Sequence, residues 1–150
     1  MKKNVFLIAV LFAACFSSTL SFAATNSDGD AKAKVVKYPT VGIDQSGLVV
    51  DSVKIADNQT VLSLSYTNSG NDSGEWFNIN KDSYIVANGQ KYSMLKADGI
   101  AIAPERSYFT YDNEKRNITL YFPAIPKSTP SIDFIESLTK GWKMYNIMLK

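Results

Sequence analysis

From Val41 onward, short apolar runs are separated by Asn, Asp, Gly and Pro at intervals of roughly ten residues, a spacing typical of an all-β sandwich or barrel. Leu62, Leu64 and Tyr66 alternate with serines, which indicates a strand with one face in the core. No stretch has a helical period of useful length. The pattern predicts an immunoglobulin-like antiparallel β-sandwich of roughly seven to nine strands.

Two hairpins are predicted in the middle of the chain. Asn88 and Gly89 separate two apolar runs within 83–95, and both residues tolerate the positive φ angles of a type I′ turn. A second hairpin is predicted to join 106–111 to 117–122 through the charged segment DNEKR. Its second strand would place three apolar side chains on one face, namely Ile118, Leu120 and Phe122.

The C-terminal third is predicted to complete the sandwich. Prolines at 123, 126 and 130 cannot donate backbone hydrogen bonds, so they indicate an extended crossover between the two sheets. A core strand is expected at 131–136 and a closing strand at 141–149. Alternation in the closing strand predicts one face with Trp142, Met144 and Asn146 and another with Tyr145, Ile147 and Leu149.

The first residues have the order of a secretory signal peptide. Lys2 and Lys3 precede an apolar run from Val5 to Phe16, which is followed by the small and polar residues SSTLSFAA. The apolar run is shorter than the ~20 residues that span a bilayer. We therefore expect export to the periplasm or the exterior, and no transmembrane segment in the mature chain.

The expected domain organisation is a signal peptide at 1–23, a flexible leader at 24–40 and the sandwich at 41–150. Small residues before Ala24 favour cleavage directly in front of it. An alternative is that FAAC is a lipobox, in which case Cys15 would be lipidated and would tether the domain to a membrane.

Charge gives no reason to expect nucleic acid or an anionic membrane as a partner. The chain has 16 basic and 14 acidic residues, and removal of the signal peptide takes away Lys2 and Lys3 and no acid. This leaves 14 basic residues against 14 acidic ones, and the basic residues are scattered along the chain.

The absence of histidine and the single cysteine, Cys15, exclude several kinds of chemistry. Ser-His-Asp hydrolysis, thiol catalysis in the mature chain and zinc sites built on His or Cys all need residues that are missing. The Asn- and Asp-rich stretches at 25–34 and 68–75 lack the spacing of a calcium loop. We therefore expect no metal and no cofactor.

Paired carboxylates are the remaining candidates for catalysis. Asp133 with Glu136, or Glu105 with Asp112, would serve a small glycosidase if each pair faced across a cleft. Asp133 and Glu136, however, flank apolar residues in an expected strand, where a solvated position explains them better. We expect that the protein is not an enzyme.

Aromatic residues suggest binding instead, since the chain has eight tyrosines, eight phenylalanines and two tryptophans. A short strand should place Trp76 and Phe77 on opposite faces. Most large aromatic side chains are expected in the core, in particular Trp76, Phe122, Phe134 and Trp142. Tyr108 and Tyr111, beside the charged segment, are the candidates for an exposed binding site.

Three segments carry a family resemblance: WFNINKDSYIVANGQKYSMLKADGI, LYFPAIPKSTPSIDFIES and GWKMYNI. Their order and spacing resemble a β-sandwich accessory domain of secreted and lipid-anchored Bacteroidetes proteins, over Leu48 to Ile147. Such domains often precede a thioredoxin-like or hydrolase-like domain, and none follows within this sequence. Where relatives have glycine, this chain has Asn146, which still permits an unusual backbone angle. The resemblance implies an accessory role and no catalytic residues.

One modification is suggested by the same resemblance. The tripeptide DSV fits a short acceptor pattern for O-glycosylation in this bacterial group, which makes Ser52 the candidate residue. An ordinary strand serine is the alternative. Together, these observations predict an exported, non-catalytic binding or structural module, whose partner is expected to be another envelope protein, with a glycan as the second choice.

Overall fold

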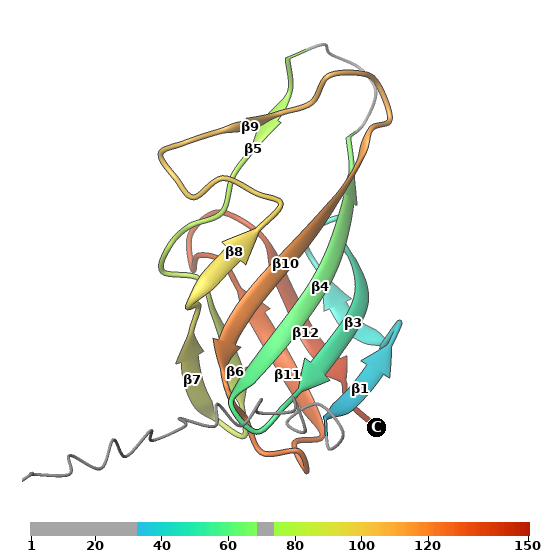
Figure 1. Ribbon diagram of the computed structural model, residues 1–150, viewed down its shortest axis with the longest axis vertical. Coiled ribbons are helices and arrows are strands. Elements are labelled where there is room, and N and C mark those ends of the chain that lie inside the picture. Colours follow the sequence, from blue (N-terminus) through green and yellow to red (C-terminus); the bar gives the residue numbers. More distant parts are fainter. Residues whose placement is uncertain (1–32, 69–73) are drawn as a thin grey trace, which may run out of the picture.

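The computed structural model describes residues 33–68 and 74–150, which form β-strands and no helix (Figure 1). All pairs of named strands are antiparallel. The described strands number twelve, more than the sequence predicts, because several are only two to four residues long.

Sheet A has five strands in the order β1-β3-β4-β10-β8. They are β1 (Lys34–Lys37), β3 (Val49–Ile55), β4 (Gln59–Thr67), β10 (Lys115–Pro123) and β8 (Lys96–Asp98). Its centre is the nine-residue pairing of β4 with β10. Sheet A therefore combines strands from the beginning, the middle and the last third of the described chain.

Sheet B also has five strands, in the order β2-β12-β11-β6-β7. They are β2 (Val41–Asp44), β12 (Lys143–Met148), β11 (Ser131–Ile135), β6 (Tyr84–Ala87) and β7 (Gln90–Ser93). A third, two-stranded sheet pairs β5 (Trp76–Phe77) with β9 (Ser107–Tyr108) at one end of the molecule (Figure 1).

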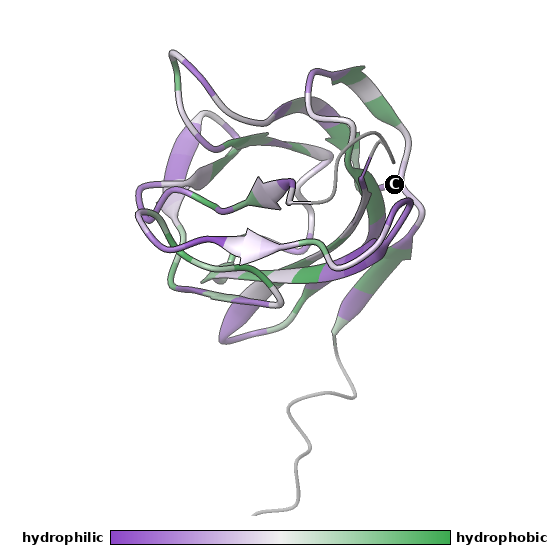
Figure 2. Cartoon of the chain, turned by 90° about the horizontal axis from the view of Figure 1, so that it is seen from above, coloured by the Kyte–Doolittle hydropathy of each residue, from purple (hydrophilic) through white to green (hydrophobic). Residues whose placement is uncertain are grey.

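One hydrophobic core lies between sheets A and B. Apolar side chains at alternate positions point inward, so the long strands of the sheets, such as β4 and β10, bury one face and leave the other more exposed. The buried side chains of sheet A include Leu62, Leu64, Ile118, Leu120 and Phe122, and those of sheet B include Ile85, Ile132, Phe134, Met144 and Ile147. Truncation of a buried phenylalanine such as Phe134 to alanine is expected to cost about 3–5 kcal/mol. Seen from the end that carries β5 and β9, the two layers curve around this interior (Figure 2).

The chain passes directly from one sheet to the other at both lateral edges. On one side β1 is the edge of sheet A and the next strand, β2, is the edge of sheet B. Tyr38 makes this corner with a positive φ of 47°. On the other side β7 ends sheet B and β8 ends sheet A, with Met94 donating to Ser83 and Leu95 donating to Tyr121.

Several sequence-based predictions are confirmed. β6 and β7 form the predicted hairpin, with Asn88 and Gly89 both at positive φ in the two-residue turn. Pro126 and Pro130 lie in the segment that leads from sheet A to β11 in sheet B, whereas Pro123 is the last residue of β10 and pairs with Gln59. Phe122 and Phe134 are fully buried.

Three expectations are wrong. β1 lies within 24–40, the range predicted as a flexible leader, so Lys34–Lys37 belong to sheet A. The second hairpin does not form, because β9 pairs with β5 and β10 pairs with β4 and β8. The predicted faces of the closing strand fail at Asn146, where a β-bulge places both Met144 and Ile147 in the core.

Candidate functional site

Three connections meet at the end of the molecule that carries β5 and β9. The β4–β6 connection contains β5, the β8–β10 connection contains β9, and the third connection is the turn between β11 and β12. The backbone amide of Asn80, from the first connection, donates to the Glu136 carboxylate of the turn. Ile79 and Ala101 are joined by a backbone hydrogen bond that links the first two connections. These contacts hold segments that are distant in sequence as one surface.

A layer of aromatic rings attaches the β5–β9 sheet to the core. Phe77 and Phe109 are stacked, with ring centroids 4.8 Å apart and planes 19° apart. The Tyr66 ring lies 6.0 Å from Phe77, 5.8 Å from Phe109 and 5.8 Å from Trp142, in tilted arrangements. Such ring pairs contribute about 0.5–1.5 kcal/mol each beyond the area they bury. The short β5–β9 sheet is thus anchored by packing, although it has only two residues in each strand.

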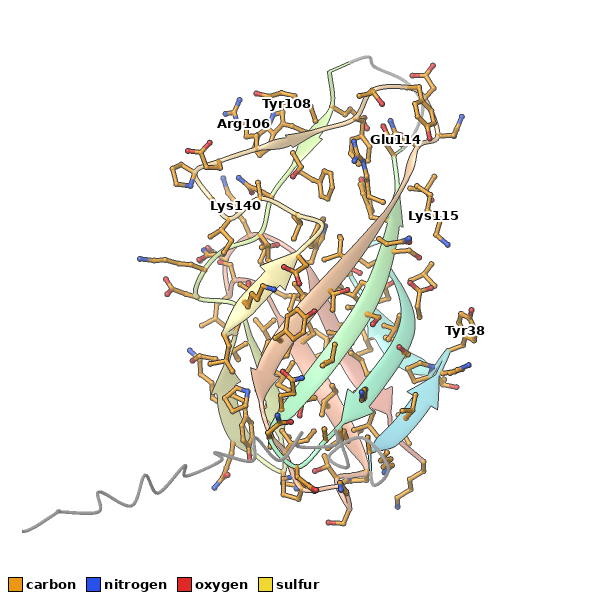
Figure 3. The ribbon with its side chains drawn as sticks, in the orientation of Figure 1. Tyr38, Arg106, Tyr108, Glu114, Lys115 and Lys140 are labelled. Carbon is orange, nitrogen blue, oxygen red and sulfur yellow. The ribbon has the colours of Figure 1, made fainter. Side chains whose placement is uncertain are left out.

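The outer face of the β5–β9 sheet carries an aromatic ridge, which we define as Trp76, Arg106 and Tyr108. Trp76 and Tyr108 are direct neighbours across the strand pair and are 46% and 54% exposed. The Arg106 guanidinium lies 4.1 Å from the centroid of the Trp76 ring, in a cation–π contact. Figure 3 shows Arg106 and Tyr108 at this end of the molecule.

A nearly buried carboxylate, that of Glu114, organises the loop that follows the ridge. It accepts hydrogen bonds from the Thr110 amide at 2.7 Å and from the Thr110 hydroxyl at 2.9 Å. The Arg116 Nε lies 2.7 Å from Glu114, and Arg116 Nη2 donates to the Tyr108 carbonyl at 3.0 Å. The Thr110 amide, followed by the Thr110 hydroxyl and Arg116, holds the pKa of Glu114 below its ordinary value of 4.5. This network fixes the backbone beneath Tyr108.

Tyr108 and Tyr111, the binding residues predicted from sequence, are both exposed, at 54% and 64%. They occupy different settings, since Tyr108 faces Trp76 across β5 and β9, whereas Tyr111 lies in the turn before β10. The carbonyl of Tyr111 accepts a hydrogen bond from the Asn68 side chain. The structure therefore places Tyr108 in the ridge and Tyr111 beside the Glu114 network.

The expected position of Trp76 was wrong. It was predicted to lie in the core, and it instead forms part of the exposed ridge. β5 is two residues long, and Phe77 takes the inward position. Opposite faces for Trp76 and Phe77 were predicted correctly, and this alternation was the signal for an exposed tryptophan. Arg106 carried no such signal, since its contact with Trp76 depends on a pairing of distant segments.

A hollow of about 300 Å³ lies on the sheet B side of the same end. Its lining residues come from the β4–β6 connection, the β6–β7 hairpin and the β11–β12 turn: Asn80, Asp82, Tyr84, Lys91, Glu136, Ser137, Leu138 and Thr139. The Lys91 ammonium lies 4.1 Å from the centroid of the Tyr84 ring. No single stretch of sequence predicted this hollow, because its walls are separated by up to half of the domain.

Of the four carboxylates considered for catalysis, Asp133 and Glu136 accept hydrogen bonds from backbone amides. Asp133 accepts a hydrogen bond from the Asn146 amide at 2.8 Å. Glu136 accepts from the Asn80 amide at 3.1 Å and from the Trp142 amide at 2.8 Å. Glu105 and Asp112 are exposed in the β8–β10 connection. Within residues 33–68 and 74–150, no group of three or more Asp, Glu, His or Cys side chains is arranged to hold a metal ion.

Ser52, the candidate glycosylation residue, is half-buried in β3, where it pairs with Lys37 of β1 and Ser63 of β4. Several other predictions concern residues that the structure does not describe. They are Cys15, the cleavage position before Ala24, nearly all of the Asn- and Asp-rich stretch at 25–34 and most of the stretch at 68–75.

Comparison with known proteins gives no relative for this chain. No family model matches it, and searches of curated proteins and of solved structures find no significant similarity. In the part of the chain that the structure describes, no helix has the length and hydropathy needed to cross a membrane.

Proposed function

We propose that this chain is an exported, non-catalytic module of immunoglobulin-like fold that binds another envelope protein through the aromatic ridge. The observation that carries the proposal is the Arg106 guanidinium stacked on the exposed Trp76 ring, beside Tyr108. Trp, Tyr and Arg are the residue types that dominate the binding energy of protein–protein interfaces.

The strand order supports the immunoglobulin-like assignment. In such domains one sheet has the order A-B-E-D and the other has the order G-F-C, extended by C′ in the variable type. Here the corresponding orders are β3-β4-β10-β8 and β12-β11-β6-β7, with β1 and β2 added at one edge. The ridge then belongs to the connections between B and C and between D and E.

Rigidity of the ridge favours binding. The stacked Phe77 and Phe109 rings hold β5 and β9 from below, and Arg116 holds the carbonyl of Tyr108. Side chains that are already ordered lose less conformational entropy when a partner binds. A pre-ordered Trp-Arg-Tyr cluster therefore binds a protein surface at a lower entropic cost than a mobile loop does.

A protein partner fits the ridge better than a glycan. A sugar that stacks on tryptophan packs against a ring face, and Arg106 already occupies one of the two faces of Trp76, which leaves less of the ring for a sugar. A partner carboxylate, in contrast, can pair with the Arg106 guanidinium while the ring edge packs against apolar atoms. The ridge thus suits a protein surface that presents an acidic group next to an apolar one.

The carboxylate contacts support a non-catalytic role. Asp133 and Glu136 each accept backbone amide hydrogen bonds that shape a bulge and a turn. Export is supported by the lysine-apolar-small order of the first residues. Lipidation of Cys15 would add a membrane tether to the same module.

Site-specific photo-crosslinking tests the proposal. A photoreactive phenylalanine analogue at Tyr108 should capture one envelope protein in intact cells, and the same analogue at Tyr38 should not. Tyr38 is a matched control, because it is 74% exposed and lies at the lateral corner between β1 and β2 (Figure 3).

The captured protein is then purified and its affinity measured. Trp76→Ala and Arg106→Ala should each weaken binding by about 2 kcal/mol, roughly thirtyfold, while Tyr38→Ala should leave it unchanged. Equal capture from both positions, or binding that is indifferent to Trp76→Ala, would refute the proposal.

A further inference from the structure

The hollow on sheet B has pre-formed walls. The Glu136 carboxylate accepts the Asn80 amide with one oxygen and the Trp142 amide with the other, so it ties the β4–β6 connection to the β11–β12 turn. The Asn80 side chain accepts the Asp82 amide at 2.9 Å, and the Asn80 carbonyl accepts the Ser83 amide at 3.1 Å. These hydrogen bonds hold the walls of the open hollow in place.

The polar groups around the hollow are mixed in kind and sign. Asp82 and Glu136 supply carboxylate acceptors, and Lys91 supplies an ammonium donor held over the Tyr84 ring at 4.1 Å. Asn80, Ser137 and Thr139 add amide and hydroxyl groups that both donate and accept. Two acidic groups beside one basic group leave a net charge of −1, which disfavours an anion, and Lys91 offsets one carboxylate, so only a weak field selects a cation. The lining therefore suits a neutral ligand with many hydroxyl groups.

Size and shape narrow the ligand further. A volume of about 300 Å³ is at the lower end of the roughly 300–1,000 Å³ typical of small-molecule sites. Leu138, which is 76% exposed, offers an apolar contact on one wall. A single pyranose ring matches this lining. It has a small apolar C–H face that can pack on Leu138 and a rim of hydroxyl groups that can hydrogen-bond to the polar side chains.

We propose that this hollow binds one neutral pyranose unit, either as a free sugar or as a residue of a glycan. Hydroxyl groups of the sugar donate to Asp82 and Glu136 and accept from Lys91, while a C–H face packs on Leu138. The site is separate from the aromatic ridge and does not depend on it. The module would thus have a protein-binding surface and a sugar-binding surface at one end.

Amide chemical-shift titration of the full mature chain tests this site. Methyl glycosides of glucose, galactose and mannose are added, each at concentrations up to about 100 mM, which is enough to saturate a site with a Kd in the millimolar range. At least one glycoside should give saturable shifts at Asp82, Lys91 and Leu138. Asp82→Ala and Lys91→Ala should each weaken that binding by fivefold or more.

Lys96→Ala is the matched control, because Lys96 also lies over a tyrosine ring, 5.1 Å from the centroid of Tyr121, but in sheet A. It should leave the shifts unchanged. Glycerol is the control for general polyol effects. The proposal is overturned if no glycoside gives saturable shifts, if glycerol gives the same ones, if shifts gather at Trp76 and Tyr108, or if the Lys91→Ala and Lys96→Ala variants behave alike.

Oligosaccharides of the bound sugar then identify its source. A site for free sugar gains no affinity from added units, whereas a site for a glycan residue binds the longer ligand more tightly. Both outcomes support a pyranose site and differ only in the ligand's origin. If the glycoside titration shows no binding, the crosslinking result expected at Tyr108 is unaffected. The sugar-binding proposal and the protein-binding proposal can therefore fail separately.

Discussion

The Asn146 amide donates a 2.8 Å hydrogen bond to the Asp133 side chain at the point where β12 has one more residue than β11. Asn146 has a positive φ of 55°, which lets the chain absorb the extra residue. Met144 and Ile147 consequently both reach the core, although three positions separate them. The bulge is what keeps the last strand in register with the interior.

The left-handed backbone at Asn146 makes its side chain decisive for stability. Asn146→Gly should change the free energy of unfolding by no more than about 0.5 kcal/mol, because glycine adopts positive φ freely. Asn146→Val should lower it by about 1–2 kcal/mol, because a branched side chain clashes in this conformation. Urea denaturation of both variants measures the difference, and equal stabilities would contradict the assigned bulge.

Substitutions at two glycines with similar backbone angles should distinguish the cost of backbone strain from the cost of a steric collision. Gly47 (φ 69°) has open space where the methyl group of an alanine would lie, whereas a methyl group on Gly99 (φ 80°) would collide with the Asn117 carbonyl of β10. Gly47→Ala should cost about 1 kcal/mol, the penalty of left-handed backbone alone. Gly99→Ala should cost at least about 2 kcal/mol more, since β10 must shift. Calorimetric Tm values that fall equally for both would show that the collision is absent.

Glu114 should make stability depend on pH in the acid range. Its pKa is lowered in the folded state, so the unfolded chain takes up the proton first as the pH falls. The stabilisation is complete above the ordinary value of 4.5 and is lost as the pH falls through the lower folded pKa. The Tm of the unsubstituted chain should exceed that of Glu114→Gln at pH 7, and the gap should narrow toward pH 3.

The control for this pH effect is Glu105→Gln, which removes an exposed carboxylate from the same β8–β10 connection. Its Tm difference from the unsubstituted chain should be small at both pH values. A gap for Glu114→Gln that widens toward pH 3 would show that the assigned hydrogen bonds do not favour the ionised carboxyl.

Phe109 should control the attachment of the β5–β9 sheet. Phe109→Ala removes the stacking with Phe77 and should cost about 3–5 kcal/mol, mostly through loss of local order. In amide hydrogen exchange, protection should fall at Ile79, whose amide bonds to Ala101 beside the ridge, and persist at Leu64 in β4. Uniform loss of protection would mean that the two-stranded sheet is not a separate unit. Crosslinking from position 108 should fall with it.

Local sequence patterns identified the parts of the fold that depend on neighbours in sequence. The Asn88–Gly89 turn has the backbone angles that a two-residue hairpin requires, and its strands pair as predicted. Pro126 and Pro130, which follow β10, lie in the connection to the other sheet, as expected of residues that cannot donate a backbone hydrogen bond. Burial of Ile118, Leu120 and Phe122 follows from simple alternation.

The parts of the fold and of the candidate site that sequence patterns did not predict depend on pairing between distant segments. β1 is only four residues long and becomes a strand because β3 provides its partner. β9 pairs with β5, about thirty residues earlier, and no periodicity in two residues reveals this choice. The ridge and the hollow share this property, so sequence indicated Tyr108 but gave no sign of Arg106 or Lys91.

The edge strands bear on aggregation. An exposed sheet edge can recruit a strand from another molecule, and short or charged edges discourage this. Here β1, β2 and β7 have four residues each and β8 has three. β1 carries Lys34 and Lys37, β7 carries Lys91 and β8 carries Lys96. A strand from another molecule could therefore pair with only three or four residues at each edge before the chain turns into the other sheet. On both lateral sides these residues include lysine. The fold is protected against edge-to-edge polymerisation by the same corners that join its layers.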